Sequence, residues 1–196
     1  MLSLLNFLSE VKSSRRKQGQ QYDTGSVLML SILAMSSGAV SYRKIHEYMT
    51  IMFPALRQLL NLNWKKPPVY NSLRYILISV NTSSLEKCFR KYSKYLQKMM
   101  RVSESNSNPD YLKKYDILSV DGKCLKNSFD NMKEQKMKQI LSVFDADKKL
   151  ILAHKEISDK TNEIPEFQSL IKELNLEHSI FTADAMHTQK NFRIMH

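Results

Sequence analysis

Hydrophobic residues in the first half of the chain recur mostly at the three- to four-residue spacing of a helix. Leu2, Leu5, Leu8 and Val11 make the first run, and a basic polar loop follows. A nearly continuous apolar stretch from Ser26 to Ser37 is then closed by Gly38, a residue typical of helix ends. The pattern predicts further helices, namely one capped by Ser41, a short one after Pro54, one over residues 70–80, and a long one from about residue 83 to residue 100.

In the second half, short apolar runs replace this helical spacing. They predict strands at residues 115–120, 139–144, 150–157 and 180–182, a helix over residues 165–175, and a last helix from Met186 onward. The polar stretch 101–110 contains one proline and no apolar periodicity, so it reads as a linker. We therefore predict an α+β protein, with a helical domain over residues 1–100 and a β-β-β-α-β-α domain over residues 111–196.

Two aspartates stand at the ends of predicted strands of this second domain. The first three strands should form an antiparallel meander, and the helix should return the fourth strand parallel to an earlier one. If that neighbour is the first strand, Asp121 and Asp184 meet at one edge of the sheet and can share a hard divalent cation. Alternatively, each aspartate is only a turn residue or a helix cap.

Charge divides the chain in the same place. Residues 1–110 carry 16 Lys and Arg against 6 Asp and Glu, whereas residues 111–196 carry 14 against 13. The basic half indicates either a module that binds a polyanion or a solvated basic surface. The longest apolar run, residues 27–35, is too short to span a bilayer, and we expect no signal peptide, no membrane partner and a reducing cytoplasm for Cys88 and Cys124.

Several short motifs carry a resemblance to a known family. In the second domain they are Asp121-Gly122-Lys123, then Lys160-Thr161-Asn162-Glu163-Ile164, then Asp184-Ala185-Met186-His187-Thr188-Gln189. In this order they resemble the signatures of DDE-type insertion-sequence transposases, in the group that includes the H-repeat-associated proteins. Residues 4–96 are similar to the associated N-terminal domain of that group, through Arg15-Arg16-Lys17-Gln18-Gly19, Tyr22, residues 41–45 and residues 71–74.

The resemblance implies an RNase H-like catalytic fold, of which this chain holds the first part. Asp121 would be the first catalytic acid and Asp184 the second, both ligating Mg²⁺ or Mn²⁺. The metals would activate water, and later a 3′-hydroxyl, for in-line attack on DNA phosphates. The family places a glutamate on a later helix, well beyond the segment that holds the second acid, and the sequence stops at His196. We therefore expect a C-terminally truncated chain with weak activity or none.

Other residues receive supporting roles by the same resemblance. Those expected to contact DNA are Arg15, Arg16, Lys17, Lys123, His187 and Gln189, and those expected to order the site are Asn162 and Glu163. A solvated surface position is the open alternative for the basic residues, and a place on a helix surface is the alternative for His187 and Gln189.

The sequence thus predicts a bacterial transposase that cleaves DNA and transfers strands with Mg²⁺, associated with the nucleoid when it binds DNA. Its partner would be double-stranded DNA, as transposon ends and as target, and self-association into a homo-oligomer is left open. The alternative function is that of a transposase remnant without catalysis, which binds transposon ends or inhibits a full-length partner.

Overall fold

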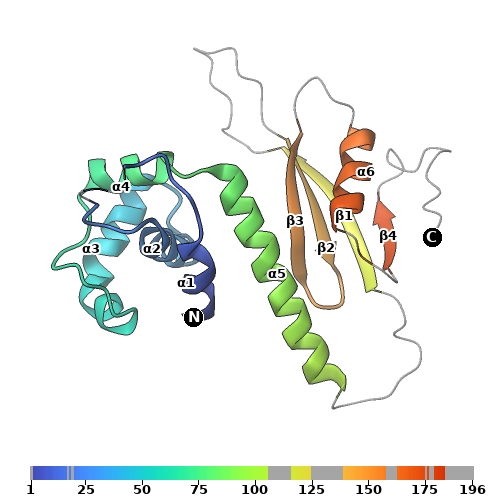
Figure 1. Cartoon of the computed structure of the whole chain (residues 1–196), viewed down its shortest axis with the longest axis horizontal. Coiled ribbons are helices and arrows are strands. Elements are labelled where there is room, and N and C mark those ends of the chain that lie inside the picture. Colours follow the sequence, from blue (N-terminus) through green and yellow to red (C-terminus); the bar gives the residue numbers. More distant parts are fainter. Residues whose placement is uncertain are drawn as a thin grey trace, which may run out of the picture. The chain divides into compact units, whose positions relative to one another are not determined.

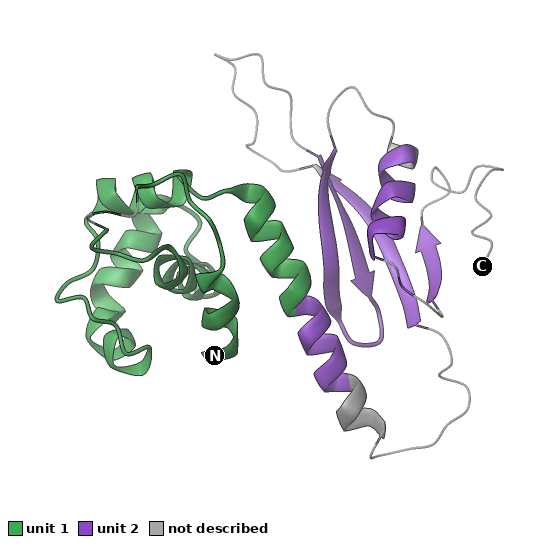
Figure 2. Cartoon of the chain, in the orientation of Figure 1, with its two compact units in different colours: residues 1–92 green, residues 93–196 purple. Residues whose placement is uncertain are grey.

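A computed structural model of the chain describes residues 2–16, 18, 20–105, 116–124, 139–157, 163–174, 176 and 179–183. The chain divides into two compact units, residues 1–92 and residues 93–196 (Figure 2). The boundary lies inside one long helix, α5 (Thr82–Ser105), and so differs from the expected break after residue 100. Residues 101–105 of the predicted linker are helical, and the rest of that stretch is outside the described residues. No helix in the described ranges is long and apolar enough to cross a membrane.

Unit 1 is built from helices, as the apolar spacing predicted. They are α1 (Leu2–Ser9), α2 (Thr24–Ser36), α3 (Tyr42–Leu59), α4 (Tyr70–Ile78) and the first part of α5 (Figure 1). Ser41 caps α3 through a hydrogen bond from the Lys44 amide to its hydroxyl, at 3.3 Å. Gly38 follows α2 with φ of +92°, the left-handed conformation for which glycine is suited.

One prediction in unit 1 is wrong. The expected separate helix after Pro54 is the second half of α3, which runs through the proline. Proline removes one backbone hydrogen bond, but it need not end a helix whose packing holds both halves. In α3 the buried face continues from Met49 through Phe53 to Leu56. Tertiary burial therefore outweighs the local break.

The core of unit 1 surrounds α2. Val27, Leu30 and Leu73 are fully buried. At Gly25, α1 passes so closely that an added Cβ would lie 2.9 Å from the Cα of Ser9. The absence of a side chain at this position therefore lets the two helices approach each other at their backbones.

Unit 2 contains a four-stranded mixed sheet. Its elements are β1 (Asp116–Cys124), β2 (Gln139–Asp145), β3 (Leu150–Ile157), α6 (Glu163–Leu174) and β4 (Ser179–Ala183). The strand order is β3-β2-β1-β4, with an antiparallel meander and with β4 parallel to β1. This confirms the predicted α+β class, and it shows that β4 lies beside β1, the arrangement on which the meeting of Asp121 and Asp184 depends. The predicted helix from Met186 lies outside the described residues.

Helix α6 covers one face of the sheet (Figure 1). Phe167 and Leu170 of α6 are buried with Leu118 and Val143 of the sheet in one apolar cluster. Because side chains alternate along a strand, Ile117, Ser119 and Asp121 face the opposite side of β1. Asp121 therefore projects from the face that α6 does not cover.

Candidate functional site

Asp121 lies within β1 rather than after it, which corrects the sequence-based placement. The strand continues to Cys124, and Asp121 pairs with Ser142 of β2. Aspartate, glycine and lysine resemble a turn locally, but an antiparallel neighbour supplies a full set of partners and extends the strand. The last described pair of the parallel ladder to β4 is Val120 with Ala183, directly before Asp121.

The parallel ladder is fixed by side chains next to this position. The hydroxyl oxygens of Ser119 and Thr182 lie 3.0 Å apart across β1 and β4. The Thr182 hydroxyl also donates to the backbone oxygen of Leu118, at 3.3 Å. These contacts hold the two strands in register immediately before the two aspartates of the sequence motifs. Asp184 itself, the residue after Ala183, is outside the described residues.

The Asp121 carboxylate is solvent-exposed, and an exposed lysine is its only described ion-pair partner. Lys123 Nζ lies 3.6 Å from Asp121 Oδ2, with both side chains more than half exposed. Such a pair is weak and screened by salt, so the carboxylate oxygens remain accessible to a cation. A carboxylate of this kind fits a Mg²⁺ ligand, although no group of three candidate ligands occurs among the residues that the structure describes. The predicted DNA contact of Lys123 stays a prediction.

Several predicted site residues have no described position. Lys17, Asn162, His187 and Gln189 join Asp184 outside the described residues. Glu163 is the first residue of α6, and its side chain is not described.

At the opposite end of β1, the structure holds a buried charge cluster that sequence reasoning did not identify. Lys148 Nζ donates to Asp116 Oδ1 at 2.8 Å and to Asp145 Oδ2 at 3.1 Å, and Asp145 is fully buried. Burial would lower the pKa of Lys148, but its hydrogen bonds to the two carboxylates and their charges outweigh that effect and raise the pKa. The local sequence favours a simple hairpin-turn residue at Asp145. In the structure Asp145 ends β2 and holds the turn in place through this ion pair.

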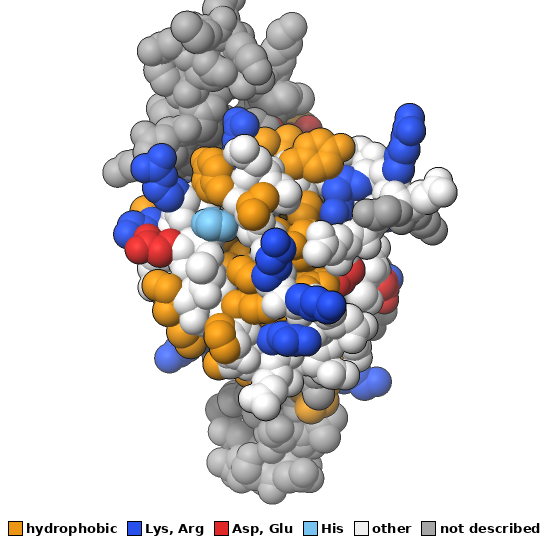
Figure 3. Space-filling model, turned by 90° about the vertical axis from the view of Figure 1, so that its left-hand side faces the viewer, with side chains coloured by type: hydrophobic (Ala, Val, Ile, Leu, Met, Phe, Trp, Pro, Cys, Tyr) orange, Lys and Arg blue, Asp and Glu red, His pale blue; other side chains and the backbone are white. Residues whose placement is uncertain are grey.

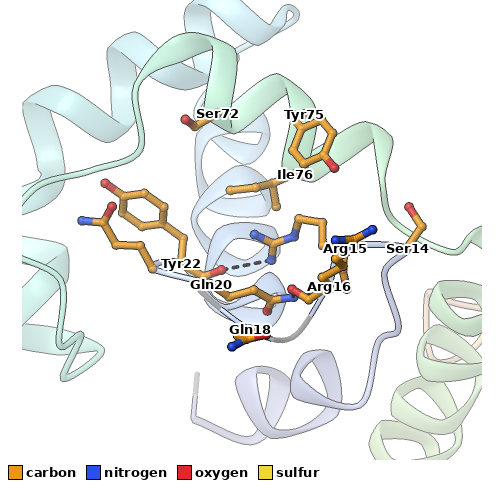
Figure 4. A pocket seen from close by; sticks show the side chains of 10 residues that line it. Ser14, Arg15, Arg16, Gln18, Gln20, Tyr22, Ser72, Tyr75 and Ile76 are labelled. Carbon is orange, nitrogen blue, oxygen red and sulfur yellow. Dashed lines mark hydrogen bonds between the residues drawn. The ribbon is translucent and has the colours of Figure 1, made fainter.

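Unit 1 contains a polar pocket of about 510 Å³ around the predicted basic cluster (Figure 4). The loop over residues 14–22 forms one wall and α4 forms the other. The lining residues are Ser14, Arg15, Arg16, Gln18, Gln20, Gln21, Tyr22, Ser72, Tyr75 and Ile76. None of them is acidic, so the pocket carries net positive charge. Lys and Arg side chains also gather on the face of the molecule in Figure 3.

Arg15 is held inside this pocket by neutral groups. Its Nη2 donates to the Tyr22 backbone oxygen at 3.0 Å and to Thr24 Oγ1 at 2.8 Å. Its Nε is buried and has no hydrogen-bond partner in the described part of the chain, where Arg15 also forms no ion pair. Burial lowers the pKa of Arg15, against the opposing charges of Tyr75 and Asp23, yet the group stays cationic at neutral pH. Arg15 therefore presents a cation that makes no direct ion pair within the described residues, although the charge of Asp23 still acts on it.

The fold and these two sites define a basic helical unit followed by an α+β unit with an accessible carboxylate beside a parallel strand pair. Residues 5–93 match the family model described as DDE_Tnp_1-associated. The chain is 23% identical over 188 residues to the "H repeat-associated putative transposase YhhI" of Escherichia coli K12, covering 96% of this chain and 46% of that protein.

Two further relatives from the same strain agree with this match. "Putative protein YbfL" is 23% identical over 96% of this chain and 46% of its own length, and "Putative transposase YncI" is 22% identical over 96% and 71%. No solved structure matches the chain significantly. The resemblance to the H-repeat-associated transposase group is thereby confirmed, and it supports a transposase-related role. The chain spans about half the length of the first of these relatives.

Proposed function

We propose that the chain is the DNA-binding and first catalytic part of a transposase that cleaves DNA strands with Mg²⁺ or Mn²⁺. The observation that carries this proposal is the parallel pairing of β4 with β1, whose last described pair is Val120 with Ala183. Asp121 and Asp184 are the next residues of the two chain segments. Two carboxylates following paired residues of adjacent parallel strands are suited to share a divalent cation.

In this proposal the sheet is the catalytic part of an RNase H-like domain. Asp121 and Asp184 would hold the cation, and Lys123 would contact a phosphate near them. The bound cation would supply Lewis-acid stabilisation of the phosphate and activation of water. The DNA strand would bind at the face of β1 that carries Asp121, opposite α6. Unit 1 would supply affinity for the DNA backbone through Arg15 and Arg16.

Cleavage of supercoiled plasmid by the purified chain tests the catalytic half of the proposal. We expect slow nicking in Mg²⁺ or Mn²⁺ that is lost in Asp121→Asn and in Asp184→Asn. Asp147→Asn is the matched control, because Asp147 is an exposed aspartate in the β2–β3 turn. Mn²⁺ binding measured by calorimetry gives a second readout, and it should weaken in the first two variants only. Nicking or Mn²⁺ binding that survives both substitutions would disprove this site.

The second candidate function is DNA binding without catalysis. It is favoured by the pocket of unit 1, whose lining holds two arginines and no acidic residue. Binding to labelled DNA that weakens steeply with salt, with no nicking at any metal concentration, would select this function. Such a chain could occupy transposon ends or interfere with a longer transposase.

A further inference from the structure

The unit 1 pocket has more volume than a single phosphate group bound by its two arginines would fill. A cavity of about 510 Å³ is in the size range of sites that enclose a small organic molecule. Its basic residues are also accompanied by groups of other kinds. A ligand that uses the whole lining must therefore offer more than a phosphate.

The lining divides into three chemical parts. Arg15 and Arg16 offer guanidinium groups to an anion, and the Nε of Arg15 has no hydrogen-bond partner in the described part of the chain. Gln18 and Gln21 bring amide groups, which both donate and accept hydrogen bonds as base edges require, whereas the Nε2 of Gln20 already donates to the Arg16 backbone oxygen. The third part comes from α4.

On α4, Ser72, Tyr75 and Ile76 are three and four residues apart and so share one helix face (Figure 4). Tyr75 is 64% exposed, which is high for a large aromatic side chain on a packed helix. Ile76 by contrast is buried and forms an apolar part of the lining. An aromatic ring beside an apolar floor can take the flat face of a nucleobase by stacking.

The wall opposite α4, formed by the loop over residues 14–22, is held in place by hydrogen bonds. The backbone amide of Ser14 donates to the oxygen of Ser79 at 2.9 Å, and that of Asn81 donates to the oxygen of Lys12 at 2.9 Å. Gln20 Nε2 donates to the Arg16 backbone oxygen at 2.9 Å and closes the loop on itself. The loop and the end of α4 are therefore tied together at the base of the pocket.

We propose that this pocket binds one unpaired nucleotide of a DNA strand, with the phosphate on the arginines and the base between Tyr75 and the glutamine amides. This inference rests on the proposed DNA binding by unit 1 and goes beyond it. Backbone contacts alone would not distinguish paired from unpaired DNA, because both present phosphates. The pocket instead confers a preference for DNA with an unpaired end.

Fluorescence anisotropy with the full chain tests the preference. The probes are a short blunt duplex and the same duplex with a single-stranded extension of a few nucleotides. We expect the wild type to bind the extended duplex about tenfold more tightly, the scale of one stacked base. Tyr75→Ala should remove this difference by weakening the binding of the extended probe.

Two charge variants complete the experiment. Arg16→Ala should weaken binding to the extended probe and reduce its salt dependence by about one phosphate contact. Lys87→Ala removes an exposed charge of α5 outside the pocket, and should leave the ratio between the two probes unchanged. Arg16 is chosen over Arg15 because Arg15 also holds the loop through Tyr22 and Thr24.

The outcomes separate the two proposals. Binding of both probes with equal affinity, or a preference that persists in Tyr75→Ala, would overturn the nucleotide pocket while leaving DNA binding intact. Failure of the folded wild type to bind either probe would overturn DNA binding itself, and the pocket with it. Circular dichroism of each variant establishes that it is folded.

Discussion

The buried lysine at the β2–β3 turn gives the sharpest test of what holds unit 2 together. Lys148→Met keeps the length and the apolar stem of the side chain but removes its charge. The lysine side chain is 5% exposed, and its two partner carboxylates are 15% and 0% exposed. The substitution therefore leaves the Asp145 carboxylate buried without a counter-ion.

Removing one partner of a buried ion pair costs about 3–5 kcal/mol. Some compensation remains, because the Lys148 backbone amide still donates to Asp145 Oδ1 at 3.0 Å and Gln97 Nε2 still lies 3.4 Å from Oδ2. Asp116 is partly exposed and can regain water. We therefore expect the lower end of that range, about 3 kcal/mol, in the free energy of unfolding of unit 2.

Hydrogen exchange of peptides from β1 to β3 is the suitable measurement, because it reports on unit 2 separately from unit 1. Lys123→Met is the matched control, because it removes a lysine from the exposed ion pair with Asp121. It should lower the free energy of unfolding by at most about 0.5 kcal/mol. An effect of Lys148→Met no larger than that of Lys123→Met would refute the reasoning.

The same ion pair predicts a dependence on alkaline pH. The pKa of Lys148 is raised in the folded state, so its contribution to stability is complete below the unfolded value of about 10.4. It is lost as the pH rises through the folded pKa, where the folded lysine also gives up its proton. The difference in stability between wild type and Lys148→Met should therefore shrink above about pH 10.4, and a constant difference there would contradict the assignment.

Three further predictions concern packing. Gly25→Ala should destabilise unit 1 by about 1–3 kcal/mol, although alanine favours helix, because the new Cβ meets the backbone of α1. Urea unfolding followed by Trp64 fluorescence measures this change. A neutral or stabilising result would contradict the close contact. Phe167→Ala should cost unit 2 about 3–5 kcal/mol, measured by hydrogen exchange, because this side chain is 1% exposed; a cost near zero would mean that α6 does not bury it. Burial raises the pKa of the Cys88 thiol, which also donates a hydrogen bond to the Phe7 backbone oxygen at 3.1 Å. Alkylation of Cys88, monitored by peptide mass spectrometry, should therefore be slow until unit 1 unfolds.

The fold could be predicted from the sequence where local pattern and chain connectivity agree. Apolar spacing located the helices of unit 1, and the β-β-β-α-β order left few topologies once crossover rules were applied. Those rules predict that β4 runs parallel to an earlier strand, and the structure shows that this strand is β1. The family motifs then identified Asp121 as the residue of interest.

What could not be predicted depends on contacts between distant segments. The Asp121-Gly122-Lys123 triplet looks like a turn, and only the pairing of Asp121 with Ser142 shows that the strand continues. Pro54 looks like a break, and only the buried face of α3 shows that the helix persists. In both cases tertiary partners decide between conformations that the local sequence leaves close in energy.

The pocket of unit 1 shows the same dependence at a functional level. Arg15 and Arg16 stand out in the sequence as basic residues, which suggests an exposed surface for the DNA backbone. Folding instead brings α4 against their loop and sets Tyr75 beside them, while Arg15 becomes partly desolvated. A partly desolvated cation that makes no direct ion pair attracts an anion more strongly than a fully exposed one, because water competes less for either partner. The sequence predicts the positive charge of Arg15 and Arg16, but the proposed preference for an unpaired nucleotide depends on the pocket that the loop and α4 form together.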